Sequence, residues 1–145
     1  MNKNIQFRVS VVGLFIDNQE VLLLHQITPP EPDCWDLPGG GLEPGETLFA
    51  GLKREIQEET GIEEFNIDQL LTVVEGFFPQ SDDQLLHTVN IVYQCSLDYK
   101  VLNLTSNDPE IGPKGIQWLN ISELTPENCS TRAWKALQTV NLVTN

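Results

Sequence analysis

Three glutamates, Glu55, Glu58 and Glu59, lie near the end of a stretch that has a helical pattern. Residues 47–60 contain no proline and only one glycine, so we predict a helix there. With about 100° of rotation per residue, Glu58 lies near −60° and Glu59 near +40° from Glu55. The three carboxylates therefore share one face. Oxygen ligands without cysteine or histidine indicate a hard cation, Mg²⁺, Mn²⁺ or Ca²⁺, and not zinc.

The ordinary alternative for an acidic helix is a solvated outer face, but the apolar residues argue against it. The same helical wheel gives an apolar arc formed by Leu48, Phe49, Leu52 and Ile56. Glu59 lies inside this arc and not opposite it. Carboxylates in the last turns of a helix are unfavourable by about 0.3–1 kcal/mol each, and neighbouring like charges add about 0.2–0.5 kcal/mol per pair. A bound cation would remove both penalties.

A run of three glycines, residues 39–41, precedes this helix. Glycine lets the backbone approach a ligand closely and leaves carbonyl and N–H groups accessible. A plain loop is the alternative. Because the run lies just before the carboxylate helix, we expect it to form a wall of a metal and phosphate site.

The rest of the chain predicts the elements that position this helix. Strand-like runs cover residues 7–16, 21–27, 70–78, 85–97 and 116–119. Thr47 is a plausible N-cap of the first helix and Gly61 a plausible left-handed stop, and a second, amphipathic helix is expected at 130–143. Strands mixed with two helices predict an α/β domain built on a mixed sheet.

Composition limits the functions that need to be considered. The 145 residues suit one domain, 1–145, and carry a formal net charge of −13. This charge argues against binding to a nucleic-acid duplex or an anionic membrane. An anionic substrate would need a cation to bridge it. Three cysteines without a CxxC pair, and an N-terminus without an apolar run, favour a cytoplasmic protein without disulfides.

The glycine and glutamate pattern resembles the Nudix box. Gly40, five residues, Glu46, seven residues and then Arg-Glu-Ile-Gln-Glu-Glu-Thr-Gly-Ile at 54–62 match that box at every specified position, so the box covers 40–62. The flanking segments also look like this family, whose fold is an α/β/α sandwich with a mixed sheet. The resemblance implies a hydrolase of the MutT-like type that cleaves a diphosphate linkage in a nucleoside diphosphate derivative by water attack at phosphorus, using Mg²⁺ or Mn²⁺.

The resemblance also implies roles for individual residues. Glu55, Glu58 and Glu59 would be metal ligands, Glu58 and Glu59 being catalytic as well, and the Gly39 carbonyl would be a further ligand. Arg54 would pair with box carboxylates, chiefly that of Glu46.

Glu110 lies in a loop where relatives place an extra carboxylate that binds metal or activates water. A solvated turn acid is the alternative for this residue.

The sequence leaves the substrate open between nucleoside triphosphates, ADP-ribose and nucleotide sugars. Trp35, Phe77, Phe78 and Trp118 are candidates to stack on a base, although such residues are more often core. Many relatives end their second strand with an arginine, where this chain has His25 and Gln26. The alternative to an enzyme is a catalytically silent nucleotide-binding or regulatory module. A homodimer is also possible, since several relatives pair.

Overall fold

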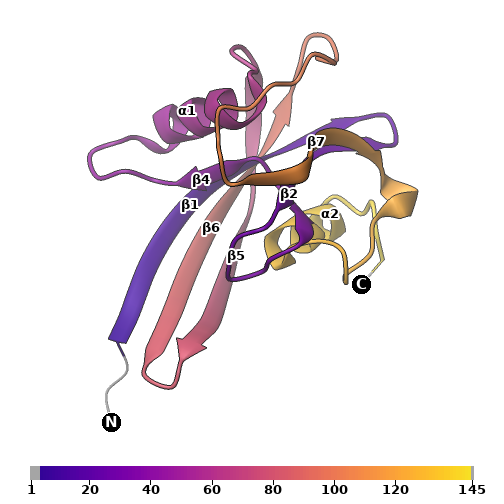
Figure 1. Cartoon of the computed structure of the whole chain (residues 1–145). Coiled ribbons are helices and arrows are strands. Elements are labelled where there is room, and N and C mark those ends of the chain that lie inside the picture. The colour runs from indigo at the N-terminus through magenta and orange to yellow at the C-terminus, as the bar shows by residue number, and fades with distance from the viewer. Residues whose placement is uncertain (1–3, 145) are drawn as a thin grey trace.

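The computed structural model describes residues 4–144 of the chain. Within them the strands are β1 (Asn4–Asp17), β2 (Glu20–Gln26), β3 (Cys34–Asp36), β4 (Gly39–Gly41), β5 (Asn66–Ser81), β6 (Gln84–Ser96) and β7 (Ile111–Asn120). The helices are α1 (Leu48–Thr60), α2 (Thr131–Thr139) and the short 3₁₀ helix η1 (Ile121–Glu123). Figure 1 shows β1, β5 and β6 projecting as a long arm below the rest of the molecule.

The sheet is mixed, as predicted. Its strand order is β3-β2-β1-β6-β5, with β4 added to β1 and β7 added to β2. β1 runs parallel to β6 from Asn4 to Phe15, and pairs with β2 in the antiparallel sense only at its end. The first two predicted strands therefore form a hairpin, although most of β1 pairs with a strand that lies far away in the sequence.

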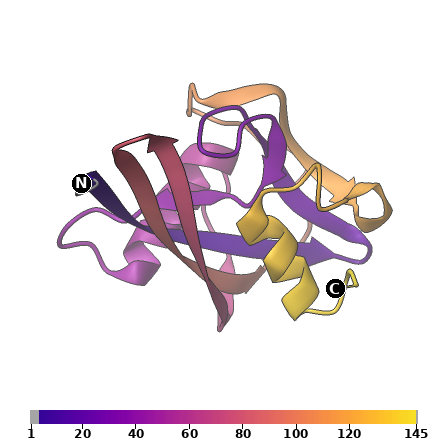
Figure 2. The ribbon, with the colours of Figure 1, turned by 90° about the horizontal axis from the view of Figure 1, so that it is seen from below.

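Each helix covers one face of this sheet. Side chains alternate between the two faces of β1, so Phe15 packs with Leu52 and Ile56 of α1, whereas Leu14 packs with Leu137 of α2. Figure 2 shows the same arrangement from below, with α2 lying against the strands. This layering confirms the predicted α/β/α sandwich.

The local signals that bound α1 are confirmed. The Thr47 side chain accepts a hydrogen bond from the N–H of Ala50 at 3.1 Å, and Gly61 ends the helix with a left-handed φ of 79°. The predicted apolar arc is wrong in its first turn, because Leu48 and Phe49 are 36% and 53% exposed. Burial begins only at Gly51, although the exposed ring of Phe49 still contacts the ring of Tyr93 in β6, with centroids 5.4 Å apart.

The three glycines form a strand and not the plain loop that was the alternative. In β4, Gly39 pairs with Val12 of β1 and has a φ of 138°. A Cβ at Gly39 would lie 2.2 Å from the carbonyl oxygen of Val11. The close approach expected of these glycines is therefore to the neighbouring strand, and only glycine fits at this position.

Other boundaries also differ from prediction, since β5 begins at Asn66 and not at 70, and β7 begins at Ile111 and not at 116. Residues 79–81 belong to β5, where Pro79 is tolerated because β5 is an edge strand. α2 is shorter than the predicted 130–143, since Asn141 adopts a left-handed φ of 60° and the N–H of Leu142 bonds back to the carbonyl of Leu137. Within residues 4–144 no helix is both long and apolar enough to cross a membrane.

Candidate active site

One cavity of about 580 Å³ gathers most of the residues singled out by the sequence. Its acidic end is lined by Glu55, Glu58, Glu59 and Glu110, together with the backbone of residues 39–41. The opposite end lies over β5 and β6 and reaches the first turn of α2. The cavity thus joins the α1 carboxylates to a surface formed by distant strands.

Glu59 is the most deeply buried carboxylate of the acidic end. Its side chain accepts a hydrogen bond from the N–H of Gly39 at 2.5 Å, and the residue is only 7% exposed. Burial raises the pKa of Glu59 to about 9, since the single bond from Gly39 offsets little of the lost hydration and Glu55 adds like charge. This carboxylate can carry a full charge at neutral pH only if a cation compensates it.

Arg54 connects the acidic end to the loop before α1. Its guanidinium donates two hydrogen bonds to Glu46, at 2.7 and 2.9 Å, and one to Glu55 at 2.9 Å. These bonds, with one from the N–H of Glu43, hold the pKa of Glu46 near 2. Burial raises the pKa of Glu55, and the contact with Arg54 opposes that rise. The predicted Arg54–Glu46 pair is present.

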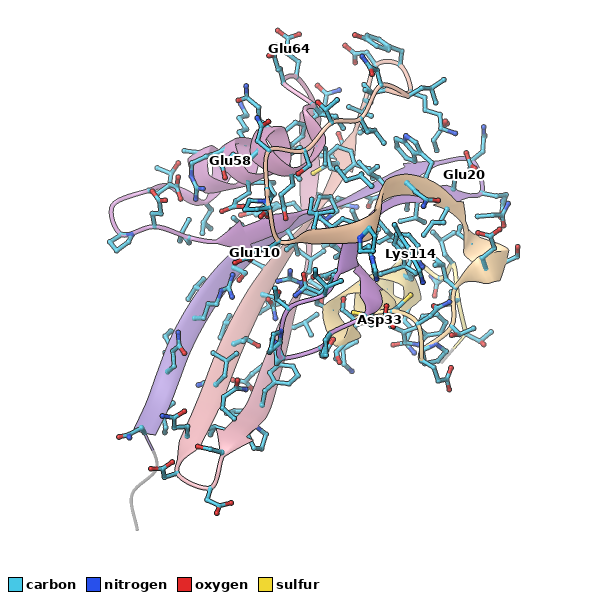
Figure 3. The ribbon with its side chains drawn as sticks, in the orientation of Figure 1. Glu20, Asp33, Glu58, Glu64, Glu110 and Lys114 are labelled. Atoms are coloured by element: carbon cyan, nitrogen blue, oxygen red, sulfur yellow. The ribbon has the colours of Figure 1, made fainter. Side chains whose placement is uncertain are left out.

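Glu58 and Glu110 reach the acidic end from different elements. Figure 3 shows Glu58 on α1 and Glu110 on the segment that crosses below it. This segment is tied to the end of α1, because the N–H of Asn107 bonds to the carbonyl of Glu58 at 3.0 Å and that of Thr105 to the carbonyl of Thr60 at 3.1 Å. Glu110 is thereby held among the residues that line the cavity.

The acidic end has the chemistry of a hard-cation site, but its carboxylates do not converge. Among residues 4–144 no three His, Cys, Asp or Glu side chains form a ready-made metal cluster. Glu59 is turned to the Gly39 N–H and Glu55 to Arg54, while Glu58 lies 3.6 Å from the Arg54 guanidinium. An oxygen-only donor set with one buried carboxylate fits Mg²⁺ or Mn²⁺, which would replace these contacts.

Comparison with known proteins identifies the family. The NUDIX domain family matches residues 6–140. The chain belongs to this family. An "ADP-ribose pyrophosphatase" of Methanocaldococcus jannaschii is 32% identical to this Nudix chain over 85 residues, which are 59% of the chain and 48% of that protein. A "Putative 8-oxo-dGTP diphosphatase 2" of Mycobacterium tuberculosis is 40% identical over 57 residues, which are 39% of the chain and 40% of that protein.

A solved structure of the family shares the whole fold. The MutT NUDIX hydrolase of Burkholderia pseudomallei has a TM-score of 0.74 and 25% identity, and the superposition covers 94% of this Nudix chain and 99% of that one. In contrast, the match spans less than half the length of the two curated relatives named above.

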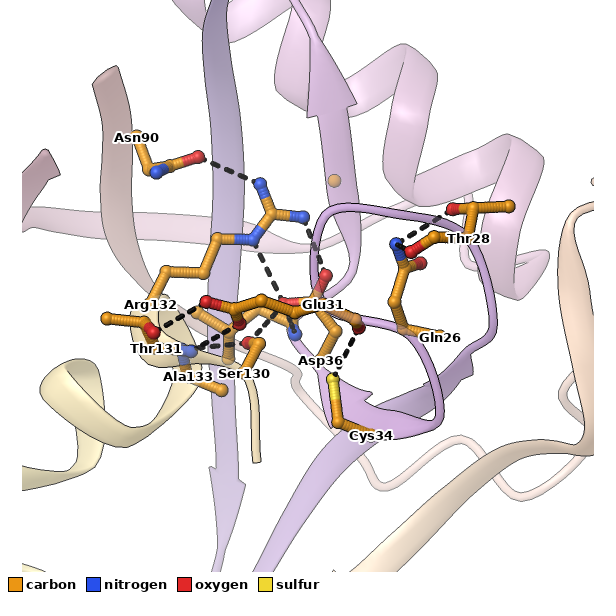
Figure 4. A network of polar contacts seen from close by, with 12 residues as sticks. Gln26, Thr28, Glu31, Cys34, Asp36, Asn90, Ser130, Thr131, Arg132 and Ala133 are labelled. Carbon is orange, nitrogen blue, oxygen red and sulfur yellow. Dashed lines mark hydrogen bonds and ion pairs between the residues drawn. The ribbon is translucent and has the colours of Figure 1, made fainter. Parts of the chain in front are cut away.

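The structure also adds a network that the sequence did not single out. Arg132 of α2 pairs with both oxygens of Asp36, at 2.9 and 2.8 Å, and donates to the Asn90 side chain at 2.9 Å (Figure 4). Ser130 donates to the same Asp36 at 2.7 Å. All four residues line the cavity of this Nudix domain. Partners 96 and 42 positions apart leave no local signal by which the sequence could reveal them.

The aromatic candidates separate into different surroundings. Phe78 lines the cavity, while Phe77 stacks on His87 with ring centroids 4.3 Å apart and is 57% exposed. Trp35 and Trp118 are partly buried and pack against the two core clusters, which is the alternative that the sequence also allowed. Phe78 is therefore the aromatic residue best placed to meet a bound ligand.

The two residues at the end of β2, His25 and Gln26, have different surroundings. The ring of His25 is buried, bonding to Asp33 through Nε2 at 2.8 Å and accepting from the N–H of Lys114 through Nδ1 at 3.2 Å. Gln26 lines the cavity, but its amide donates to Thr28. The contacts of both residues are therefore made within the protein, and neither places an arginine-like cation at this position.

Proposed function

We propose that this Nudix domain is a divalent-cation-dependent hydrolase that cleaves a diphosphate linkage in a nucleoside diphosphate derivative. The observation that carries the proposal is the set of Glu55, Glu58, Glu59 and Glu110 around one cavity. Glu59 is buried, with a pKa of about 9, and the chain has a net charge of −13. A cation bound among these carboxylates is therefore needed before the cavity can bind a polyphosphate. The curated relatives named above are a pyrophosphatase and a diphosphatase, which agrees with this activity.

Each residue at the acidic end has a distinct role in the proposed reaction. Glu55, Glu58 and Glu59 hold Mg²⁺ or Mn²⁺, with the Gly39 carbonyl as a further ligand. The bound ion supplies charge neutralisation of the diphosphate and lowers the pKa of the attacking water. Arg54 positions Glu55 through its 2.9 Å hydrogen bond and keeps the preceding loop against α1. Glu110 lines the same cavity, and its proposed role is to accept a proton from the water.

The first test replaces single carboxylates by amides of the same shape. Glu58→Gln and Glu59→Gln are each expected to reduce Mg²⁺-dependent turnover by about 100-fold or more, because even the partners of metal ligands cost about 10–100-fold. Turnover would be followed by chromatography with nucleoside triphosphates, ADP-ribose and nucleotide sugars.

Glu64→Gln is the matched control, since Glu64 is exposed and lies outside the cavity. The substitution also replaces a carboxylate by an amide. It should keep wild-type turnover. If both cavity variants keep nearly unchanged activity, with the fold intact by circular dichroism, Glu58 and Glu59 are not ligands of a catalytic cation. Nucleotide binding without any turnover in the wild type would favour the silent binding module instead.

The setting of the reaction follows from the same proposal. The proposed ligand is a small nucleotide. The three cysteines, Cys34, Cys95 and Cys129, are free and buried. Burial raises the pKa of Cys34 and Cys95 to about 12, so these thiols stay protonated and unreactive. Such thiols suit the reducing cytoplasm, which we propose as the location. The possible homodimer stays a prediction.

A further inference from the structure

The cavity contains very little positive charge for a site that must hold a polyphosphate. Arg8 and Arg132 are the basic residues among those described around it, and acidic residues outnumber them. The charge of Arg132 is already used, because Asp36 accepts two of its N–H bonds at 2.9 and 2.8 Å. Arg8 is therefore the cation to consider.

Arg8 has no partner among residues 4–144. No carboxylate lies within ion-pair distance of its guanidinium there, and the group makes no hydrogen bond to the described residues. A guanidinium carries five N–H donors in a planar fork that matches phosphate oxygens. Exposed and unpaired within the described part of the chain, Arg8 can meet an anionic ligand without first breaking another contact.

The position of Arg8 relates it to the acidic end. On β1 it lies opposite Thr88 of β6, on the face that borders the cavity. Its guanidinium atoms lie 3.5–3.9 Å from the point where a Cβ of Gly41 would be. The adjacent Gly40 lies against the carboxylate of Glu55. Because successive residues of a strand face opposite sides, Arg8 and Glu55 approach β4 from its two faces, and both line the same cavity.

We infer that Arg8 binds a phosphate group beyond the two that the cation site holds, so the preferred substrates are nucleoside triphosphates. This inference rests on the proposed function. In ADP-ribose both phosphates lie between two sugars and both belong at the acidic end, so no anionic group remains for Arg8. A triphosphate adds a terminal phosphate, and its charge is complementary to the unpaired guanidinium.

The test compares two substrate classes in one set of variants. Arg8→Gln should lower kcat/KM for nucleoside triphosphates by about 10-fold to 100-fold, mainly through KM, the range expected when charge-assisted hydrogen bonds are lost. For ADP-ribose the change should stay within about twofold. Arg8→Lys should be intermediate, because it keeps the charge and loses the fork.

Lys135→Gln is the matched control, since it removes one positive charge from an exposed position on α2 outside the cavity. It should leave both substrates unaffected. An equal loss for triphosphates and ADP-ribose in Arg8→Gln would place the contact at the shared diphosphate and overturn the inference. Unchanged kinetics with triphosphates would overturn it as well.

A binding measurement separates this inference from the proposed function. Calorimetry with a triphosphate whose α,β-bridging oxygen is replaced by methylene, in the presence of Mg²⁺, needs no turnover. Weaker binding to Arg8→Gln than to the wild type, by at least about tenfold, would support the phosphate contact even in a protein that hydrolyses nothing. Equal binding to both proteins would overturn it, whatever the result of the hydrolysis assay.

Discussion

At the scale of single residues, the buried carboxylate of Glu59 is unfavourable for stability but is needed for the proposed cation site. Its buried carboxylate has one hydrogen-bond donor, the Gly39 N–H, and burial raises its pKa to about 9. In the metal-free protein, Glu59→Gln is expected to match or exceed the wild-type melting temperature at pH 7–8. The glutamate is ionised in the unfolded chain at that pH and must take up a proton on folding, whereas the amide needs none and its oxygen still accepts the bond. Differential scanning calorimetry in EDTA measures this.

Addition of Mg²⁺ supplies the second half of the comparison. A ligand that binds only the folded state stabilises it by about 2.7 kcal/mol at 100 times its dissociation constant. The wild type should therefore melt at a higher temperature in Mg²⁺ than in EDTA, while Glu59→Gln should gain much less. If Glu59→Gln gains as much as the wild type, Glu59 does not hold the ion.

The residues of the box were predictable because their signals are local. Glu55, Glu58 and Glu59 lie within five positions on one helix, so their common face follows from helix geometry alone. The burial of Glu59 was also indicated by its place among apolar residues. Arg8 and Arg132 carry no such signal, since their surroundings are made by strands and a helix far away in the sequence.

At the scale of elements, β4 sets the position of the cavity wall through one glycine. A side chain at Gly39 would meet the carbonyl of Val11 at 2.2 Å and would need an unfavourable φ of 138°. Gly39→Ala is expected to destabilise the protein by at least about 1–3 kcal/mol and to detach β4 from β1. Urea unfolding followed by tryptophan fluorescence measures the loss.

Gly41→Ala serves as the control for this effect. A Cβ at Gly41 would meet only Arg8, at ordinary contact distances of 3.5–3.9 Å. Its free energy of unfolding should stay within about 0.5 kcal/mol of the wild type, in the range of surface substitutions. Comparable losses in both variants would show that β4 is sensitive to any side chain, and the argument from Gly39 geometry would fail.

At this scale the sequence predicted some elements and missed others. The boundaries of α1 were predictable because Thr47 and Gly61 act within one helical turn. The strand character of residues 39–41 was not, because it depends on Val12 of β1, which lies 27 positions from Gly39. The same limit explains the first turn of α1, where the exposure of Leu48 and Phe49 depends on what the sheet places opposite them and not on the helical period.

At the scale of the whole molecule, the Arg132 network holds together the two walls of the cavity. Arg132 on α2 contacts Asp36 of β3 and Asn90 of β6. These two strands lie on opposite sides of β1 in the strand order. Removing one partner of a buried ion pair costs about 3–5 kcal/mol. Arg132→Met is expected to lose that amount in urea unfolding, whereas Lys135→Gln on the same helix should lose less than about 0.5 kcal/mol.

The same pair gives the molecule a defined response to acid. Burial alone would raise the pKa of Asp36, but the charge and hydrogen bonds of Arg132, with those of Ser130 and the Leu37 N–H, hold it below its usual range. An unfolded aspartate has a pKa of about 3.9, so the stabilisation is complete above that pH and is lost as the pH falls through the lower folded pKa. The free energy of unfolding should decline below about pH 4 in the wild type and decline less steeply in Asp36→Asn. Equal slopes in the two proteins would mean that carboxylates elsewhere, and not this link between the walls, govern acid stability.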